Sequence, residues 1–465
     1  MRLMAVPISF GTDGWRAVIA DAFTFDNVRL VSDAIAVAAR TLQPPAAIDR
    51  NALAVGFDRR FLSREFAATV AESLRAAGFC VLLSDRPTPS QTVSFTARRR
   101  NLLGGVMVTA SHNPAQYNGL KFKAWYGGSA LPETYDAIAA SLGKRDLREG
   151  GSVAEENVLE DYVDALRAQL DLELLRSASL KILHDPIHGA AAGIPSRILD
   201  HVEGIRGETN PSFGGVNPEP IPENLHASRD VMRSGGYDLA ICNDGDADRV
   251  GILDERGGFV SPHKVISLLA LYLVREKKRS GDIVKTFSTT RLIEKVAHAL
   301  GATLHETAIG FKYVADLMLA RNVLIGGEES GGIGFGHFMP ERDGILSGLL
   351  VAEAVAYYKL PLSEVIARME QEFGALFYDR RDLHRPMERC ARLIDRVRAG
   401  ELDSAFGVAL ASREEKDGVK MNFRDGSWLL FRKSGTEPII RIYCERPDAA
   451  GVQAMLDAAV AELDA

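Results

Sequence analysis

The sequence predicts an α/β protein made of three α/β units of similar topology with mixed sheets, followed by a smaller α+β unit at the C-terminus. Its 465 residues exceed the roughly 250–300 residues at which a single hydrophobic core stops growing. Short β-branched runs alternate with amphipathic segments of helical length, and this rhythm recurs three times. After about Gly374 the composition shifts to charged residues, and two strands follow near Met421 and Trp428.

The first unit shows the rhythm most clearly. Residues 53–57 and 79–83 are predicted strands, and Ser63 to Gly78 is a predicted helix with a suitable N-cap at its start and a glycine at its end. The next apolar run, 104–109, is a third strand, and it ends where a polar loop begins.

The second and third units repeat the pattern. The second starts with a strand at 180–184 and closes with one at 237–242, and the third starts near Val260 with a helix around Ser267 and a strand at 282–286. Breaks fall in the polar stretch 144–156, the turn 255–258 and the segment 374–381. They divide the chain into predicted domains 1–150, 151–257, 258–373 and 374–465.

Bulk properties exclude several classes of protein. A net charge of −7 gives no basic footprint for nucleic acid, so any phosphate site needs a local cluster of cations. The most apolar stretch, 265–274, is about half the roughly 20 residues of a membrane-spanning helix. The N-terminus has no apolar h-region, and no cysteines form a C-x-x-C pair. We therefore expect a cytoplasmic protein with reduced thiols, no nucleic-acid partner and no membrane segment.

The segment 109–114, Thr-Ala-Ser-His-Asn-Pro, follows a buried strand. Asn113-Pro114 blocks continuation of a regular element, so Ser111 and His112 are predicted on a turn at the carboxyl end of that strand, where α/β sheets place active sites. A structural Ser/Asn/Pro turn is the alternative. A hydrolase nucleophile is disfavoured because the G-x-S-x-G elbow is absent.

Three carboxylates alternate in the loop 243–249, at Asp244, Asp246 and Asp248. Alternation on a tight loop lets all three converge on one hard cation. The spacing also fits an EF-hand, but Arg249 stands at its glycine position, and strands flank the loop where helices should. A solvated acidic turn is the remaining alternative. Three aligned carboxylates between buried strands would repel one another without a cation, so we predict a metal site.

Three further loops carry polar side chains. In 326–332, Glu328 or Glu329 with Ser330 suits sugar hydroxyls. The glycine spacing of this loop fits neither the G-x-G-x-x-G pattern nor the P-loop pattern of nucleotide-binding sites. The loop 432–438 suits a phosphate, which Arg432, the hydroxyls of Ser434 and Thr436 and the N–H of Gly435 could surround. A surface hairpin turn is the alternative. The turn 11–16 is glycine-rich and ends in a cation, and alone it is a weak signal.

In this order and spacing, the five loops resemble those of the α-D-phosphohexomutase superfamily, which includes phosphoglucomutase, phosphomannomutase and phosphoglucosamine mutase. The resemblance spans nearly the whole chain, from Phe10–Arg16 to Arg432–Pro438. It implies four domains around a central active-site cleft, with a more mobile fourth domain. It also implies a Mg²⁺-dependent enzyme, a monomer or homodimer, that interconverts hexose 1- and 6-phosphates through a hexose 1,6-bisphosphate.

The same resemblance implies roles for individual residues. Ser111 is the phosphoserine, and it holds Mg²⁺ together with Asp244, Asp246 and Asp248. Proton transfer is left open between His112 and Lys121. The implied phosphate and sugar contacts are Lys121 and Arg249 at the transferring phosphoryl group, Glu328 and Ser330 at the sugar hydroxyls, Arg432, Ser434, Gly435 and Thr436 at the non-reacting phosphate, and Arg16, Lys285 and Lys312 as further contacts.

One departure bears on the choice of sugar. Phosphomannomutase-type members often have His two residues after the sugar-loop serine, and Gly332 stands there in this chain. Glucose phosphates are therefore the favoured substrates, then mannose or dual specificity, and glucosamine last. Two rival classes are a serine hydrolase and a non-catalytic Ca²⁺- or sugar-binding protein. The hydrolase would need a base held by a carboxylate. The binding protein would have no use for a nucleophile and two cationic loops.

Overall fold

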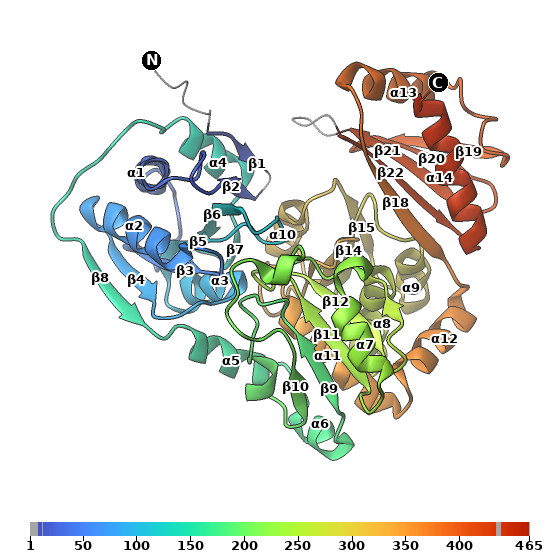
Figure 1. Cartoon of the computed structure of the whole chain (residues 1–465), viewed down its shortest axis with the longest axis horizontal. Coiled ribbons are helices and arrows are strands. Elements are labelled where there is room, and N and C mark those ends of the chain that lie inside the picture. Colours follow the sequence, from blue (N-terminus) through green and yellow to red (C-terminus); the bar gives the residue numbers. More distant parts are fainter. Residues whose placement is uncertain (1–7, 12, 434–438, 465) are drawn as a thin grey trace.

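The structure is a computed structural model that describes residues 8–11, 13–433 and 439–464. Within these ranges the strands form four sheets, of eight, five, four and five strands in chain order. The first sheet lies at one end of the molecule and the fourth at the other, with the second and third between them (Figure 1). The chain is thus the predicted series of α/β units with a distinct C-terminal unit.

The first three sheets share one topology. In each, four strands lie in the spatial order second, first, third, fourth, where the first three are parallel and the fourth is antiparallel to the third. These strands are β3 (Asp49–Phe57), β4 (Cys80–Ser84), β5 (Leu102–Val108) and β6 (Tyr117–Ala124), then β9 (Ile182–Asp185), β10 (Val202–Gly204), β11 (Leu239–Asn243) and β12 (Val250–Asp254), then β14 (Asp282–Thr286), β15 (Leu304–Thr307), β16 (Val323–Gly327) and β17 (Ile333–Gly334). The predicted similarity of the three units and their mixed sheets are confirmed.

Short strands extend these sheets at their edges. They are β1 (Phe10–Gly11), β2 (Gly14–Val18), β7 (Gly128–Ser129) and β8 (Ser152–Glu156) in the first sheet and β13 (Phe259–Val260) in the second. Strand β8 is parallel to β4 and begins just after the boundary expected at residue 150. The domain boundaries stay predictions.

Helices cover the sheets. They are α1 (Phe25–Ala39), α2 (Ser63–Ala76), α3 (Ser90–Arg99) and α4 (Pro132–Ala139), then α5 (Leu159–Arg167), α6 (Leu172–Ala178) and α7 (His226–Arg233), then α8 (Pro262–Arg275), α9 (Leu292–Leu300), α10 (Phe311–Ala320), α11 (Gly344–Tyr358) and α12 (Leu362–Phe373), and finally α13 (Met387–Ala399) and α14 (Ala449–Asp464). The predicted N-cap of α2 is wrong in its chemistry. Leu62 occupies the cap position at φ 57° and has no polar side-chain atom with which to cap the helix. The Ser63 hydroxyl donates to Asp58 over 2.7 Å instead of capping the helix.

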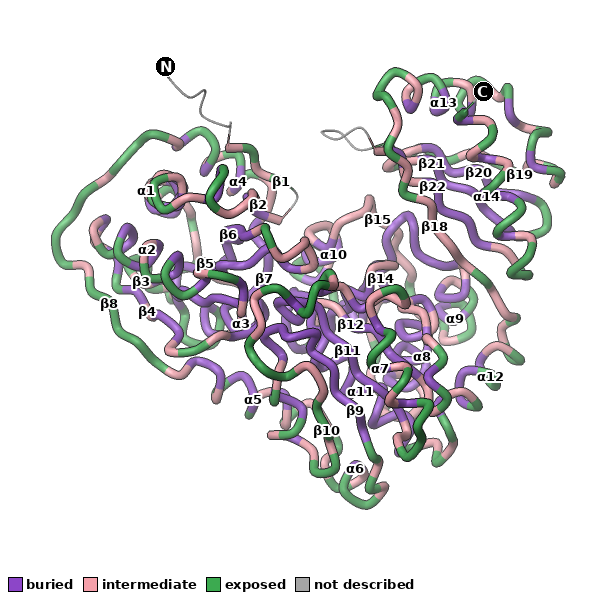
Figure 2. Tube along the Cα trace, in the orientation of Figure 1, coloured by how far each residue is buried: buried purple, intermediate pink, exposed green. Residues whose placement is uncertain are grey.

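Helix α11 is the centre of the largest core. Every residue from Gly344 to Ala356 is buried, as expected for a helix that is apolar on all sides. It packs so closely on β11 that a Cβ at Gly348 would lie 2.4 Å from Ile241 Cγ2. One hydrophobic core therefore runs through the second and third sheets, and Figure 2 shows this buried interior around α11, β9 and β11.

The fourth sheet is antiparallel throughout, which confirms the α+β character of the C-terminal unit. Its order is β18 (Phe377–His384), β22 (Ile439–Arg446), β21 (Trp428–Lys433), β20 (Val419–Phe423) and β19 (Leu410–Glu415). Helices α13 and α14 complete its separate core. A small aromatic cluster, in which Phe287 meets Trp428 and Tyr443, joins it to the third sheet.

No single helix among the described residues is long and apolar enough to cross a membrane. The pair α11 and α12 meets the length and composition criteria only together, across an 83° bend.

Candidate active site

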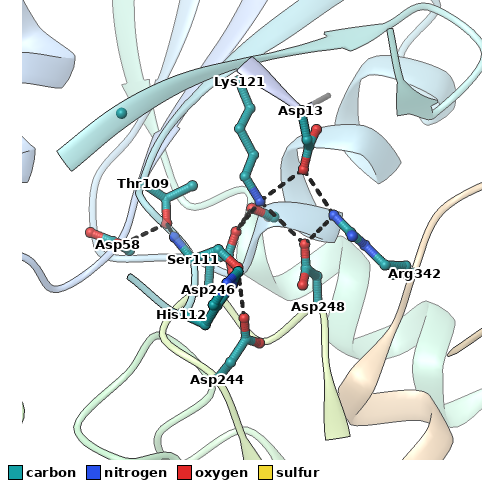
Figure 3. Close-up of polar contacts among 12 residues, drawn as sticks. Asp13, Asp58, Thr109, Ser111, His112, Lys121, Asp244, Asp246, Asp248 and Arg342 are labelled. Atoms are coloured by element: carbon teal, nitrogen blue, oxygen red, sulfur yellow. Dashed lines mark hydrogen bonds and ion pairs between the residues drawn. The ribbon is translucent and has the colours of Figure 1, made fainter. Parts of the chain in front are cut away.

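The three loops predicted from the first three units occupy equivalent places in the fold. Each connects the third strand of a sheet to its antiparallel fourth strand: residues 109–116 join β5 to β6, 244–249 join β11 to β12, and 328–332 join β16 to β17. Each loop therefore leaves the carboxyl end of a parallel strand, where α/β sheets gather functional groups. The first two loops touch, as the contact between Ser111 and Asp244 in Figure 3 shows. Arg342 links the second loop to the third, because it contacts both Asp248 and Glu328.

Ser111 lies on a tight turn with its hydroxyl in the acidic loop. Its φ of +52° is left-handed, and its backbone N–H donates to Thr109 Oγ1 at 2.9 Å. Thr109 in turn donates to Asp58 Oδ2 at 2.6 Å. The buried Oγ of Ser111 donates to Asp244 Oδ2 at 2.9 Å and lies 3.3 Å from His112 Nδ1. Burial and the neighbouring cations hold the pKa of His112 well below its usual value.

A buried arginine holds the backbone of the same turn. The guanidinium of Arg60, which follows β3, donates to four carbonyl oxygens at 2.6–3.0 Å, those of Ser111, Asn113, Pro114 and Tyr117. Its Nε atom lies 3.2 Å from Asp58 Oδ2. Asp58 and Arg60 together thus fix the shape of the turn on which Ser111 lies.

The acidic loop gathers its carboxylates at one point. Ligand oxygens of Asp244, Asp246 and Asp248 lie within 4.8 Å of one another, and all three residues are fully buried. Burial and the other two carboxylates raise the pKa of Asp244. At Asp246 burial opposes ionisation, but the charge of Lys121 outweighs it and lowers the pKa. Two of the three carboxylates are thus in strongly perturbed surroundings, as at many functional sites.

Two of these carboxylates each have an oxygen without a hydrogen-bond partner among the described residues. These oxygens are the buried Oδ1 atoms of Asp246 and Asp248. A buried carboxylate oxygen without a partner is costly, and an oxygen-binding cation would satisfy both atoms. The all-oxygen donor set suits Mg²⁺ or Ca²⁺ rather than a soft transition metal.

Two cations close the acidic cluster. Lys121 on β6 is fully buried, and its Nζ lies 2.8 Å from Asp246 Oδ2, 3.2 Å from Asp248 Oδ2 and 3.1 Å from Asp13 Oδ2. Arg342 Nη2 lies 2.7 Å from Asp248 Oδ2 and 2.8 Å from Asp13 Oδ2. Burial opposes the charge of Lys121, but the three carboxylates raise its pKa. The site therefore concentrates fixed charges of both signs around the Ser111 hydroxyl.

Sequence reasoning missed Asp13, Asp58, Arg60 and the segment 341–343. In that segment Glu341 accepts from Lys123 Nζ at 2.6 Å, and Asp343 accepts from the Tyr162 hydroxyl at 2.9 Å. Each side chain of the segment therefore contacts residues of an earlier sheet or helix. Three consecutive charged residues directly before the apolar run of α11 are a signal that could have found it.

The loop 328–332, which the sequence predicts to bind sugar hydroxyls, presents one buried carboxylate. Glu328 lies with Oε2 3.4 Å from Arg342 Nη1, and burial raises the pKa of Glu328 to about 7. Glu329 accepts from Ser288 Oγ at 2.8 Å and lies 3.6 Å from Arg380 on β18. Ser330 is half-buried on the same loop. The two glutamates thus face different parts of the protein, with Glu328 toward the acidic cluster.

The remaining predicted residues fall into two groups. Arg16 reaches the serine loop, where its Nη1 donates to Asn113 Oδ1 at 2.7 Å. Arg249 donates its backbone N–H to Asp244 Oδ1 at 2.9 Å, while its guanidinium donates to Glu219. Arg16 therefore contacts the serine loop, and Arg249 contacts the acidic loop through its backbone.

Three predicted cations contact other groups. Lys285 is buried and pairs with Glu306 at 3.1 Å. Lys312 is half-buried, with Nζ 5.0 Å from the ring of its neighbour Tyr313. Arg432 Nε donates to Asp417 Oδ1 at 2.8 Å. Their roles stay predictions, and Ser434, Gly435 and Thr436 lie outside the described residues.

Comparison with known families gives one result along the whole chain. The models of the phosphoglucomutase/phosphomannomutase family match in order: alpha/beta/alpha domain I at residues 7–149, domain II at 160–258, domain III at 261–373 and the C-terminal domain at 388–462.

Individual relatives agree on the family and differ in the sugar that their names give. The chain is 29% identical to the phosphoglucomutase/phosphomannomutase of Thermococcus kodakarensis over 446 residues, 94% of each chain. It is 30% identical to the phosphoglucosamine mutase of Symbiobacterium thermophilum over 472 residues, 98% of this chain and 99% of the relative. A solved structure from Thermus thermophilus, provisionally named a phosphomannomutase, has 36% identity and a TM-score of 0.87, covering 99% of this chain and 100% of that one.

Proposed function

We propose that this chain, which belongs to the phosphoglucomutase/phosphomannomutase family of isomerases, interconverts α-D-glucose 1-phosphate and glucose 6-phosphate through a phosphoserine at Ser111. The observation that carries the proposal is the Ser111 hydroxyl, buried 2.9 Å from Asp244 within a cluster of three carboxylates and two cations. Phosphoryl transfer needs mainly positioning and charge stabilisation, and this cluster supports both.

The acidic loop fits a resident Mg²⁺. Asp244, Asp246 and Asp248 would hold it together with an oxygen on Ser111, and the unpartnered Oδ1 atoms are the support for this assignment. A Mg²⁺ ion held there would neutralise the negative charge on the phosphoryl oxygens.

The proposed cycle has two transfers. In the first, the bond between phosphorus and the Ser111 oxygen breaks as phosphorus bonds to the free hydroxyl oxygen of a hexose monophosphate. The proton of that hydroxyl is transferred in net terms to the freed Ser111 oxygen, and the product is a hexose 1,6-bisphosphate. The bisphosphate then turns over and returns its other phosphate to Ser111, whose storage of the group divides the isomerisation into two steps.

The chain's own side chains support this cycle. Lys121 and Arg342 offer fixed positive charge beside the transferring group, which developing negative charge requires. His112 and Lys121 are the two candidates for moving the proton, and the His112 ring nitrogen 3.3 Å from Ser111 Oγ is within reach. Glu328 and Ser330 are proposed to hold the sugar hydroxyls.

Glucose is the proposed hexose, with mannose or dual specificity second. The support is Gly332, which stands where phosphomannomutase-type members often have His. Glucosamine phosphates come last, although relatives with that name match the chain well. We also propose a cytoplasmic monomer or homodimer divided at the predicted boundaries. The unpaired state of all four cysteines is consistent with a reducing compartment.

The non-reacting phosphate is proposed to bind at the loop 432–438. Arg432, Ser434, Gly435 and Thr436 would contact it, with Arg16, Lys285 and Lys312 as further phosphosugar contacts. The position of Arg432 at the end of β21 supports this assignment.

The test is conversion of glucose 1-phosphate to glucose 6-phosphate with Mg²⁺ and a trace of glucose 1,6-bisphosphate, beside the mannose and glucosamine phosphates. We expect turnover with glucose and a covalent phosphate on Ser111 by mass spectrometry. Both should be absent in Ser111→Ala and retained in Ser196→Ala, which changes an exposed serine far along the chain. Absence of turnover with all three sugars would overturn the proposal, and tight Ca²⁺ binding with it would favour a non-catalytic binding protein.

A further inference from the structure

We infer that Gly332 and Arg342 form a specificity-determining pair: the alkyl chain of Arg342 fills the space of a side chain at position 332, and its guanidinium faces the sugar oxygens in its place. The inference rests on the proposed function and deepens it. It assigns the preference for hexose phosphates with neutral hydroxyl groups over aminohexose phosphates to Arg342.

Space, rather than backbone conformation, keeps position 332 free of a side chain. A Cβ built on Gly332 would lie 2.4 Å from Arg342 Cδ and 3.2 Å from both Arg342 Cγ and Glu328 Oε2. The backbone of Gly332 is outside the left-handed region, so other residues could adopt it. The preceding Gly331 differs, because its φ of +89° itself favours glycine. Arg342 is therefore the residue that decides what position 332 can hold.

Arg342 is held in this place from several sides. Its Nη2 atom contacts Asp13 at 2.8 Å and Asp248 at 2.7 Å, and its Nη1 lies 3.4 Å from Glu328 Oε2. The side chain is only 10% exposed, and its guanidinium lies 5.7 Å from the centre of the Phe311 ring. Figure 3 shows the guanidinium between Asp13 and Asp248. A Cβ at position 332 could not simply push so constrained a side chain aside.

The Nε donor of the Arg342 guanidinium is buried and has no hydrogen-bond partner among the described residues. Buried donors are normally paired, so an acceptor supplied by a ligand would complete the set. The alkyl chain that carries this Nε packs against Gly332 of the sugar loop. A sugar hydroxyl or phosphate oxygen bound at that loop is the acceptor that fits.

The chemistry of the guanidinium then sets the preference. Arginine donates hydrogen bonds, accepts none and stays charged at every physiological pH. It therefore favours an oxygen with lone pairs and repels a protonated amine. A histidine at position 332, with no arginine at 342, would instead present a ring that is largely neutral near pH 7 and has one acceptor nitrogen.

A double-mutant cycle tests the steric part. Gly332→Ala alone should lower the melting temperature and the kcat/KM for glucose 1-phosphate, whereas in an Arg342→Ala background the same change should cost little. Residues in contact couple strongly, so we expect the effect of Gly332→Ala on kcat/KM to differ about fivefold or more between backgrounds. Gly204→Ala is the matched control, because a Cβ there meets only His184 O at 3.9 Å. Additive effects within about twofold in both readouts would overturn the pair.

The variant Arg342→Met tests the chemical part, since it keeps an unbranched chain beside Gly332 and removes the guanidinium. We expect the ratio of kcat/KM for glucose 1-phosphate to that for glucosamine 1-phosphate to fall about tenfold, beyond any loss shared by both substrates. A ratio unchanged from the wild type would overturn the assignment. If the wild type turns over no hexose phosphate, the proposed function is wrong. The double-mutant cycle measured by melting temperature would still show whether Gly332 and Arg342 are sterically coupled.

Discussion

Arg60 Nη2 donates to the carbonyl oxygen of Ser111 over 2.6 Å, so a side chain that follows β3 holds the backbone of the candidate nucleophile. The Ser111 hydroxyl in turn reaches Asp244, which lies 133 positions further along the chain. The position of the hydroxyl relative to the acidic loop therefore depends on how firmly the turn is held, and Arg60 supplies that hold through four carbonyl oxygens.

Replacing Arg60 with Lys should lower kcat about 100-fold, the scale expected when a reacting group shifts by about 1 Å. A lysine ammonium keeps the charge but lacks the planar set of donors that spans several carbonyls. KM should change much less than kcat, because Arg60 is buried and its guanidinium donates to the backbone of the turn. The measurement is steady-state kinetics together with the phosphate content of Ser111.

Arg64→Lys is the matched control for this change, since the Arg64 side chain is exposed and pairs with Glu155 at 3.3 Å, away from the turn. Its kcat should stay close to that of the wild type. A kcat for Arg60→Lys equal to that of the control would show that the turn keeps its shape without the guanidinium.

Substitution of Gly189 by Ala should weaken Mg²⁺ binding about tenfold, the lower end of the range for residues that support metal ligands. Gly189 follows β9 and packs under the acidic loop, where a Cβ would lie 2.8 Å from Gly245 O and 2.9 Å from Asp244 O. The loop must move to make room. Titration calorimetry with Mg²⁺ gives the affinity, with Gly204→Ala as control. Equal affinities in the two variants would contradict the prediction.

Removal of divalent cations by a chelator should lower the melting temperature as well as abolish activity. The three carboxylates of the acidic loop are buried together, and a cation that binds only the folded protein stabilises it by mass action. Addition of Mg²⁺ should restore both properties. The double variant Asp246→Asn/Asp248→Asn should lose the response of the melting temperature to Mg²⁺. A response of the usual size in that variant would place the cation elsewhere.

Lys420 should make the stability of the protein depend on pH in a defined direction. Its side chain is almost fully buried, 3.9 Å from the centre of the Phe287 ring, and burial and then the charge of Lys285 lower its pKa to about 8. In the unfolded chain the pKa is about 10.4. Below pH 8 both states are protonated and the full cost of burying the charge is present. Between these values the folded state loses its proton first, so this cost disappears as the pH rises.

Lys420→Met should therefore raise the melting temperature by a few degrees at pH 7, and the gain should shrink toward pH 10. Thermal unfolding of the variant and the wild type at both pH values is the measurement. Lys416→Met is the control, because both lysines pair with Glu306, Lys420 at 3.5 Å and Lys416 at 3.1 Å, but Lys416 is 39% exposed. A gain that is equal at the two pH values would contradict the assignment.

The strands and the loops that carry chemistry were predictable from the sequence. The predicted strands at 282–286 and 239–242 are present as β14 and in β11, and Ser111 lies on the turn between β5 and β6. The reason is local: side-chain periodicity and residues such as Asn113-Pro114 restrict the backbone within a few positions. The alternating aspartates likewise converge because they share one short loop.

Contacts between distant segments were decided only by the tertiary structure. Arg342 meets Asp13 across 329 positions and Lys121 meets Asp246 across 125, and no local pattern marks either pair. Lys285 and Lys121 are both buried lysines within strands, yet one pairs with Glu306 and the other enters the acidic cluster. Local periodicity depends on near neighbours, whereas the surroundings of a buried charge depend on which loops the topology brings together. The sequence by itself therefore determined the parts of the site, and the shared topology of the three sheets decided which of them meet.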